Sequence, residues 1–202
     1  MSDQDDQDDR DDRDELDAPP ALGAVVEQER GSLPYALIHG EALVACAAWA
    51  LGDAGVMAVD LGTEWAGLVD ADEPFVLHDS LCPMTPASFI TECVARAVEL
   101  DRVVVAVRPV TDTVKMVRDG LVGETVDRET LHAVASPVVL PASVVAALDH
   151  LPDVDFPRLV AALAGRFPVE LVLAPATARR VHSPEDVAVL QALTARTRPL
   201  GG

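Results

Sequence analysis

The fold is decided by the stretch from Phe75 to Val107, which opens with Phe75-Val76-Leu77-His78-Asp79 and closes with Val103-Val104-Val105-Ala106-Val107. Both ends are short, apolar and rich in β-branched residues, as buried strands are. Between them, Thr85 as a cap and Pro86 in the first helical position predict a helix that runs to about Leu100. A strand, a helix and a second strand in this order indicate a parallel crossover unit.

The same alternation continues on both sides of this unit. Toward the N-terminus we expect strands at 21–26 and 56–59, a helix at 41–54, a polar turn at 27–34 and a loop at 61–73. Toward the C-terminus we expect helices at 141–148, 156–164 and 184–194, and a strand at 169–173. The predicted fold class is therefore α/β, with a mostly parallel sheet flanked by helices.

The alternation of predicted strands and helices stops between residues 111 and 139. Three short β-like pieces stand there, at 113–117, 121–125 and 131–134, and Asp119-Gly120 favours a hairpin turn. We therefore expect an antiparallel β-arm over about 111–139, inserted into the α/β domain.

Length and charge limit the organisation and the partners of the chain. The 202 residues favour a single domain, which we place at 21–196. The net charge is −19, and residues 1–17 hold ten acidic residues against Arg10 and Arg13. We expect a disordered acidic tail over 1–20 and a flexible C-terminus over 197–202. Without a basic surface to neutralise phosphates, binding to nucleic acid or to an anionic membrane is not expected.

The sequence also predicts a cytoplasmic protein. The acidic N-terminus is unlike a secretory signal, and the longest helix-like apolar run, at 42–51, is too short to span a bilayer. The three cysteines are widely spaced, which favours reduced thiols over disulfides.

Ligands of such sheets bind beyond the carboxyl ends of the strands, where the segments 27–35, 78–83 and 108–115 fall. Asp79 ends its strand, where a carboxylate commonly holds a divalent metal or a ribose hydroxyl. The alternative is an aspartate that caps a turn. Arg108, Asp112, Thr113 and Lys115 form a mixed polar cluster that suits a phosphate monoester, unless it is only an exposed strand face.

Arg179, Arg180 and His182 form a compact basic patch, which is either a ligand site or a solvated helix entry. The five histidines have no metal-ligand spacing, and we expect them at the surface or partly buried. No glycine-rich phosphate loop and no nucleophile elbow occur in the sequence. From the residues alone, the chain is an anion-binding α/β domain.

Four segments in chain order carry a resemblance to a known family. They are Val76-Leu77-His78-Asp79 with Pro83, Pro109-Val110-Thr111-Asp112-Thr113-Val114-Lys115, Thr125-Val126-Asp127-Arg128 with 131–137, and Arg180-Val181-His182-Ser183-Pro184-Glu185-Asp186. They resemble the patterns V-x-[VI]-H-D-A-A-R-P, P-V-x-D-T-[IV]-K, T-x-x-R-x-x-L-x-x-x-Q-T-P and K-[IV]-T-x-P-E-D. These patterns are typical of the 2-C-methyl-D-erythritol 4-phosphate cytidylyltransferases of the non-mevalonate isoprenoid pathway. The resemblance runs from about Leu22 to Leu193.

The resemblance implies a nucleotide-diphospho-sugar-transferase-like fold and a homodimer formed through the β-arm. It also implies transfer from CTP to methylerythritol phosphate with Mg²⁺ and release of pyrophosphate, a reaction driven by positioning and charge neutralisation. The roles that it implies are metal binding for Asp79, ligand binding for Asp112, Thr113, Lys115 and Arg128 (the last from the partner subunit), and catalysis for Arg30 and Arg180. Arg180 stands where the family has a lysine.

The loop after the first strand departs from the family, whose members have a glycine-rich loop A-A-G-x-G-x-R…P-K there. In this chain most of the glycines are missing, Glu27 and Glu29 occupy the loop, and Tyr35 stands in the lysine position. A like-charge contact at 4 Å costs about 4 kcal/mol at an effective dielectric of 20, so these acids disfavour a triphosphate. Two further replacements also remove polar side chains of the family pattern: Cys82 stands in place of an arginine and Ala135 in place of a glutamine.

Three hypotheses follow. The leading one is a divergent family member with weak or lost transfer activity, which persists as a dimeric binding or regulatory protein, for example beside an intact paralogue. The alternative is an active enzyme that joins CTP or another nucleoside triphosphate to a sugar phosphate. The third is a purely structural interaction module.

Overall fold

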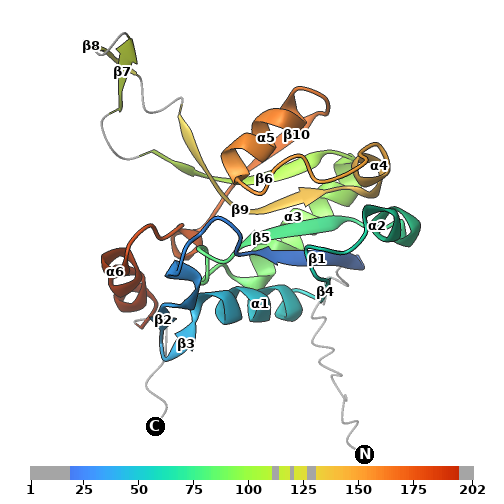
Figure 1. The fold of residues 1–202 in the computed structure, drawn as a ribbon, viewed down its shortest axis with the longest axis horizontal. Helices are drawn as coiled ribbons and strands as arrows, with labels where there is room; N and C mark the ends of the chain where they lie inside the picture. Colours follow the sequence, from blue (N-terminus) through green and yellow to red (C-terminus); the bar gives the residue numbers. More distant parts are fainter. Residues whose placement is uncertain (1–18, 111–113, 119–120, 127–130, 196–202) are drawn as a thin grey trace, which may run out of the picture.

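The computed structural model describes residues 19–110, 114–118, 121–126 and 131–195. Its centre is a six-stranded sheet in the order β10-β6-β9-β5-β1-β4 (Figure 1). The strands are β1 (Ala21–Val26), β4 (Val56–Ala58), β5 (Phe75–Asp79), β6 (Val103–Pro109), β9 (His132–Leu140) and β10 (Val169–Leu173). Only β9 runs against its neighbours, so the carboxyl ends of the other five strands share one edge. The predicted mostly parallel α/β sheet is confirmed.

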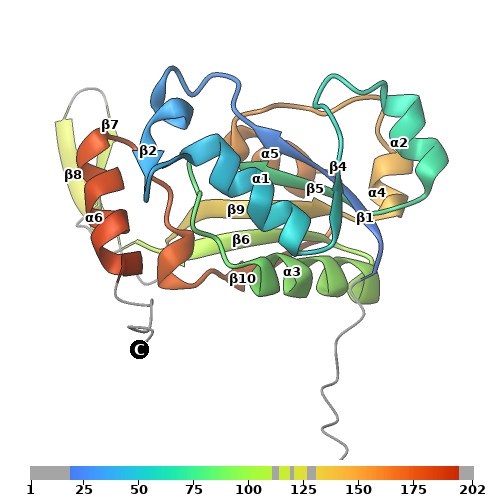
Figure 2. The same cartoon turned by 90° about the horizontal axis from the view of Figure 1, so that it is seen from below.

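Helices cover both faces of this sheet. On one face α1 (Leu43–Asp53) and α3 (Ala87–Leu100) lie side by side (Figure 2), where Leu51 and Ile90 pack on Val76 and Val104. On the other face lie α2 (Trp65–Ala71), α4 (Ala142–Ala146) and α5 (Phe156–Ala164). The sheet is therefore buried on both sides, which explains why its strands are nearly continuous runs of valine, leucine and alanine.

A smaller apolar cluster stands beside the main core. The last helix, α6 (Pro184–Ala195), packs Leu190 against Ile38 of a short antiparallel pair, β2 (Leu37–Ile38) and β3 (Glu41–Ala42). Two single turns, η1 (Leu33–Tyr35) and η3 (Ala176–Ala178), complete the carboxyl edge of the sheet. This cluster fixes the segment before α6 against the end of β5, because Val181 N–H donates to the carbonyl of Leu81.

Two local predictions were wrong. The expected loop at 61–73 contains α2, which is held by the buried Leu68 and by Trp65, whose indole N–H donates to the carbonyl of Val145. Thr85 does not cap α3: Pro86 is the residue that precedes the helix, and the Thr85 hydroxyl donates to the carbonyl of Cys82. In both places tertiary contacts outweighed the local pattern.

The inserted β segment is shorter than expected. β7 (Val114–Arg118) and β8 (Leu121–Val126) form a separate antiparallel pair, as predicted. The third piece is β9, which lies in the main sheet between β5 and β6 and is buried from Ala135 to Leu140. The arm therefore ends before residue 132 rather than at 139. Residues 1–18 of the expected acidic tail and residues 197–202 lie outside the described residues, so those two expectations stay predictions. No helix of the described residues has the length and apolarity to cross a membrane.

Candidate functional site

Asp79 lies at the carboxyl edge of the sheet, where the structure gathers the charged side chains. It is the last residue of β5, opposite Val26 of β1, and is only 1% exposed. Its Oδ1 accepts from Arg30 Nε at 3.1 Å and from Leu81 N–H at 3.0 Å, and its Oδ2 accepts from Arg180 Nε at 2.9 Å. Both carboxylate oxygens are thus bound by guanidinium groups.

Arg30 enters from the loop after β1 and is almost wholly enclosed. Besides Asp79, it donates from Nη1 to the carbonyl of Gln28 and from Nη2 to the carbonyl of Val154, each at 2.9 Å. Its guanidinium lies 5.9 Å from the centre of the Phe156 ring, a cation–π arrangement. Every nitrogen of this guanidinium is therefore engaged inside the protein.

Arg180 approaches Asp79 from the opposite side, on the segment between β10 and α6. Its side chain is 29% exposed, unlike that of Arg30, which is 3% exposed. Among the described residues, no acceptor takes a hydrogen bond from its terminal nitrogens. We call Arg30, Asp79 and Arg180 the two-arginine clamp; it carries one net positive charge, and Arg180 is its partly exposed member.

A second layer of hydrogen bonds fixes the backbone of Asp79. Ser136 Oγ accepts from Asp79 N–H at 2.9 Å and also bonds Nδ1 of His78, which is fully buried. Burial lowers the pKa of His78 to about 4, although the nearby Asp79 opposes the shift. No hydrogen-bond partner for His78 Nε2 occurs among the described residues. His78 was expected at the surface or partly buried, and that expectation was wrong.

Two cavities open beside the clamp, and Arg180 and His182 line both. The smaller, of about 330 Å³, also has Asp79, Asp155 and Phe156 in its wall. The larger, of about 660 Å³, adds Arg108 and Arg179. Asp186 also lines it and neutralises part of its charge, through contacts of 3.6 Å with Arg179 Nη2 and His182 Nδ1. Three arginines around one cavity at the end of a parallel sheet have the charge and the donors that suit an anion.

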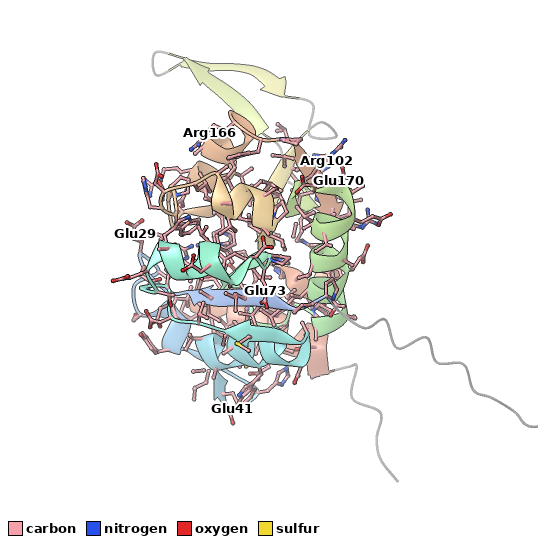
Figure 3. The ribbon with its side chains drawn as sticks, turned by 90° about the vertical axis from the view of Figure 1, so that its right-hand side faces the viewer. Glu29, Glu41, Glu73, Arg102, Arg166 and Glu170 are labelled. Atoms are coloured by element: carbon pink, nitrogen blue, oxygen red, sulfur yellow. The ribbon has the colours of Figure 1, made fainter. Side chains whose placement is uncertain are left out.

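Neither of the two acids in the loop after β1, Glu27 and Glu29, is among the residues that line these two cavities. Glu27 accepts from the hydroxyl of Tyr35 at 2.9 Å, and this hydrogen bond and the charge of Glu27 raise the pKa of Tyr35. Glu29 lies at the periphery of the molecule (Figure 3) and pairs with Arg158 Nη2 at 3.2 Å. Both acids therefore have polar partners at the surface of this loop, and their expected effect on a triphosphate stays a prediction.

The structure thus brings together three of the predicted site residues: Arg30, Asp79 and Arg180. Lys115 is in β7, and nothing is described of its side chain. Asp112, Thr113 and Arg128 lie outside the described residues, so their roles stay predictions. Sequence reasoning missed Ser136 and Phe156, as well as the carbonyl of Val154. Ser136 follows a predicted β piece and Phe156 begins a predicted helix, but no side-chain pattern marks a backbone carbonyl.

The residues present do not fit a divalent metal at Asp79. Mg²⁺ needs near-octahedral oxygen ligands at 2.0–2.1 Å, with at least one carboxylate oxygen open to it. Here both oxygens are taken by arginines, and the described residues contain no group of three histidine, cysteine or acidic side chains that could hold a metal. Burial raises the pKa of the neighbouring Cys82 thiol, so Cys82 supplies no anionic ligand.

Comparison with known proteins gives one consistent result. Residues 59–196 match the family model described as 2-C-methyl-D-erythritol 4-phosphate cytidylyltransferase. Curated relatives of that name include one from Frankia casuarinae, 35% identical over 136 residues, and one from Corynebacterium diphtheriae, 29% identical over 174 residues. These two alignments cover 65% and 83% of this chain, but only 50% and 66% of the relatives' own lengths.

A solved structure of that name from Thermus thermophilus superposes with a TM-score of 0.64 at 20% identity, and the alignment covers 87% of this chain and 98% of the other. At this identity the superposition shows only that the fold is shared. The family model and the curated relatives match the amino-acid sequence. The chain belongs to the 2-C-methyl-D-erythritol 4-phosphate cytidylyltransferase family.

Proposed function

We propose that this chain is a divergent family member whose CTP-dependent nucleotidyl transfer is weak or lost. It acts instead as a binding protein that holds a phosphorylated ligand of the sugar-phosphate class, as a homodimer formed through the β-arm. The observation that carries this proposal is the enclosure of Arg30. The resemblance gives Arg30 to the triphosphate, yet its Nε, Nη1 and Nη2 are bound to Asp79, Gln28 and Val154.

The rest of the loop supports the same conclusion. Tyr35, in the position of the family's lysine, is hydrogen-bonded to Glu27 and contributes no positive charge. A triphosphate at this loop would approach two acids and find neither a lysine nor an available arginine. Each missing charge-assisted hydrogen bond costs about 1.5–3 kcal/mol, so the loss of two weakens binding by two to four powers of ten.

Retained binding of a phosphate monoester is supported by the larger cavity. Arg108, Arg179 and Arg180 line it, and no acceptor among the described residues binds the terminal nitrogens of Arg180. A phosphate monoester carries about two negative charges and accepts several hydrogen bonds, which suits paired guanidinium groups. The same cavity also favours the second candidate, an active nucleotidyltransferase that uses an unusual loop.

A pyrophosphate-release assay separates the two candidates. The full chain is given CTP, Mg²⁺ and 2-C-methyl-D-erythritol 4-phosphate, then a panel of other nucleoside triphosphates and sugar phosphates. The Thermus thermophilus relative serves as the positive control. The proposal predicts release at the no-enzyme background for this chain. Release above background that Asp79→Ala abolishes would establish the active enzyme instead.

A further inference from the structure

Asp79 makes contacts that differ from those of a metal ligand. Its carboxylate accepts three hydrogen bonds from donors that approach on both sides, and two of these donors are guanidinium groups. A carboxylate that is 1% exposed and bound in this way is a fixed point inside the protein. What it fixes is the orientation of the arginines, because each arginine is held through its Nε atom.

The two arginines differ in what their remaining nitrogens do. Each nitrogen of Arg30 donates to an acceptor inside the protein, the guanidinium faces the Phe156 ring, and the side chain is 3% exposed, so Arg30 is a buried cation that a ligand does not reach. Arg180 contacts Asp79 through Nε, has no acceptor for its terminal nitrogens among the described residues, and lines both cavities. Arg30 therefore supplies a fixed positive charge behind Asp79, and Arg180 supplies the hydrogen-bond donors in front.

The charges around the larger cavity match a dianion without help from a metal ion. The two-arginine clamp has one net positive charge, and Arg108 adds a second from the end of β6, where its Nη1 donates to the carbonyl of Pro175 at 2.6 Å. Arg179 is balanced by Asp186. Counted over the described residues, two positive charges on side chains that are already oriented equal the charge of a phosphate monoester.

From this arrangement we propose that the larger cavity binds a phosphate monoester directly on Arg180 and Arg108, independently of any divalent cation. Asp79 is a positioning residue in this site: it aims Arg180 and binds no metal. The inference rests on the proposed retention of a phosphorylated ligand, and it adds that two arginines occupy the place that the family resemblance gives to a metal.

The test uses inorganic phosphate as the probe and isothermal titration of the full chain, once with EDTA and once with excess MgCl₂. The dissociation constants should agree within twofold. Arg180→Gln should weaken binding tenfold or more, because a charged bidentate donor is lost. The matched control is Arg102→Gln, which makes the same charge change at the start of β6, where Arg102 pairs with Glu170 at the surface (Figure 3). It should leave the dissociation constant unchanged.

A double-mutant cycle tests the positioning role. Asp79→Asn should weaken phosphate binding several-fold in the native background and have no effect in the Arg180→Gln background, because Asp79 acts through Arg180. Should Asp79→Asn not fold, Arg180→Lys replaces it. This variant keeps the charge without the fork, so phosphate binding should weaken several-fold and stay independent of Mg²⁺.

Other outcomes overturn the proposal in distinguishable ways. Binding that requires Mg²⁺, or a Mn²⁺ ion detected by electron paramagnetic resonance and lost in Asp79→Asn, would restore the metal role of Asp79 and leave the proposed weak transfer untouched. An absence of phosphate binding in both buffers would overturn this inference together with the binding part of the proposed function. Pyrophosphate release in the earlier assay would overturn only the loss of transfer.

Discussion

Arg180 Nε lies 2.9 Å from Asp79 Oδ2, and this contact joins the segment after β10 to the end of β5. Arg30 completes the arrangement from the other side of the carboxylate at 3.1 Å. Three segments that are distant in the sequence therefore meet at one buried acid. The carboxyl edge of the sheet is held by ionic contacts, while its interior is held by apolar packing.

Arg30 should be important for stability. In Arg30→Gln the buried Asp79 loses one of its two cationic partners, and breaking a buried ion pair typically costs about 3–5 kcal/mol. For a domain of this size that corresponds to a fall in melting temperature of roughly 10 °C. The control is Arg96→Gln on the exposed Arg96–Glu92 pair of α3, which should melt within about 2 °C of the native chain. A melting temperature of Arg30→Gln as close as that would contradict the buried clamp.

His78 should make stability depend on pH. Its pKa of about 4 in the folded chain lies below the unfolded value of 6.5, so the unfolded state binds the extra proton. The resulting stability is fully present above pH 6.5 and is lost as the pH falls from 6.5 toward 4, about 3 kcal/mol in total. Urea unfolding at a series of pH values measures it. His78→Asn keeps an acceptor near Ser136 but cannot titrate, so its curve should fall less steeply over that interval; parallel curves would refute the assignment.

Gly23 should tolerate no side chain. A Cβ atom there would overlap Cγ1 of Val56 and lie 3.1 Å from the carbonyl oxygen of Val76, because β1 is packed between β4 and β5. Gly23→Ala should lower the free energy of unfolding by about 1–3 kcal/mol. Gly67→Ala is the matched control, since a Cβ at Gly67 in α2 meets nothing within 4 Å. It should stabilise the chain by about 0.5–1 kcal/mol. Equal effects of the two changes would show that β1 is not so tightly packed.

The β-arm prediction concerns assembly. If the hairpin of β7 and β8 joins two subunits, replacing residues 112–129 by a short glycine-serine linker should convert a dimer into a monomer. Light scattering coupled to size-exclusion chromatography measures the mass of both forms. A linker variant that remains dimeric would place the interface elsewhere on the protein.

Much of the fold follows from the sequence. Phe156–Ala164 and Val169–Leu173 begin and end where their patterns predict, because an apolar helix face and a β-branched run are local signals. The assignment of β9 to the main sheet is a matter of pairing at long range, which no local pattern reveals. The order of the strands beside it depends on the same long-range contacts.

The candidate site was only partly predictable from the sequence, again because contacts between distant segments leave no local pattern. The place of Asp79 at the end of a strand and of Arg30 in the loop after the first strand could be expected from the predicted strands, whereas Arg180 was assigned to this site by the family resemblance. Their mutual pairing could not, because it depends on how the loop after β1 folds back onto the carbonyl of Val154. The outward pairs of Glu27 and Glu29 escaped prediction for the same reason, as Arg158 is 129 residues from Glu29 in the chain.

Titration of the full chain with CTP and Mg²⁺ in a calorimeter tests the central claim most directly. Because Arg30 is enclosed and Tyr35 stands in place of a lysine, we predict that the dissociation constant of CTP is about a millimolar or weaker. Under the same conditions, 2-C-methyl-D-erythritol 4-phosphate should bind measurably. The Thermus thermophilus relative provides the positive control. A micromolar dissociation constant for CTP with Mg²⁺ would contradict the account, because it would require Arg30 to leave Asp79 and serve the triphosphate.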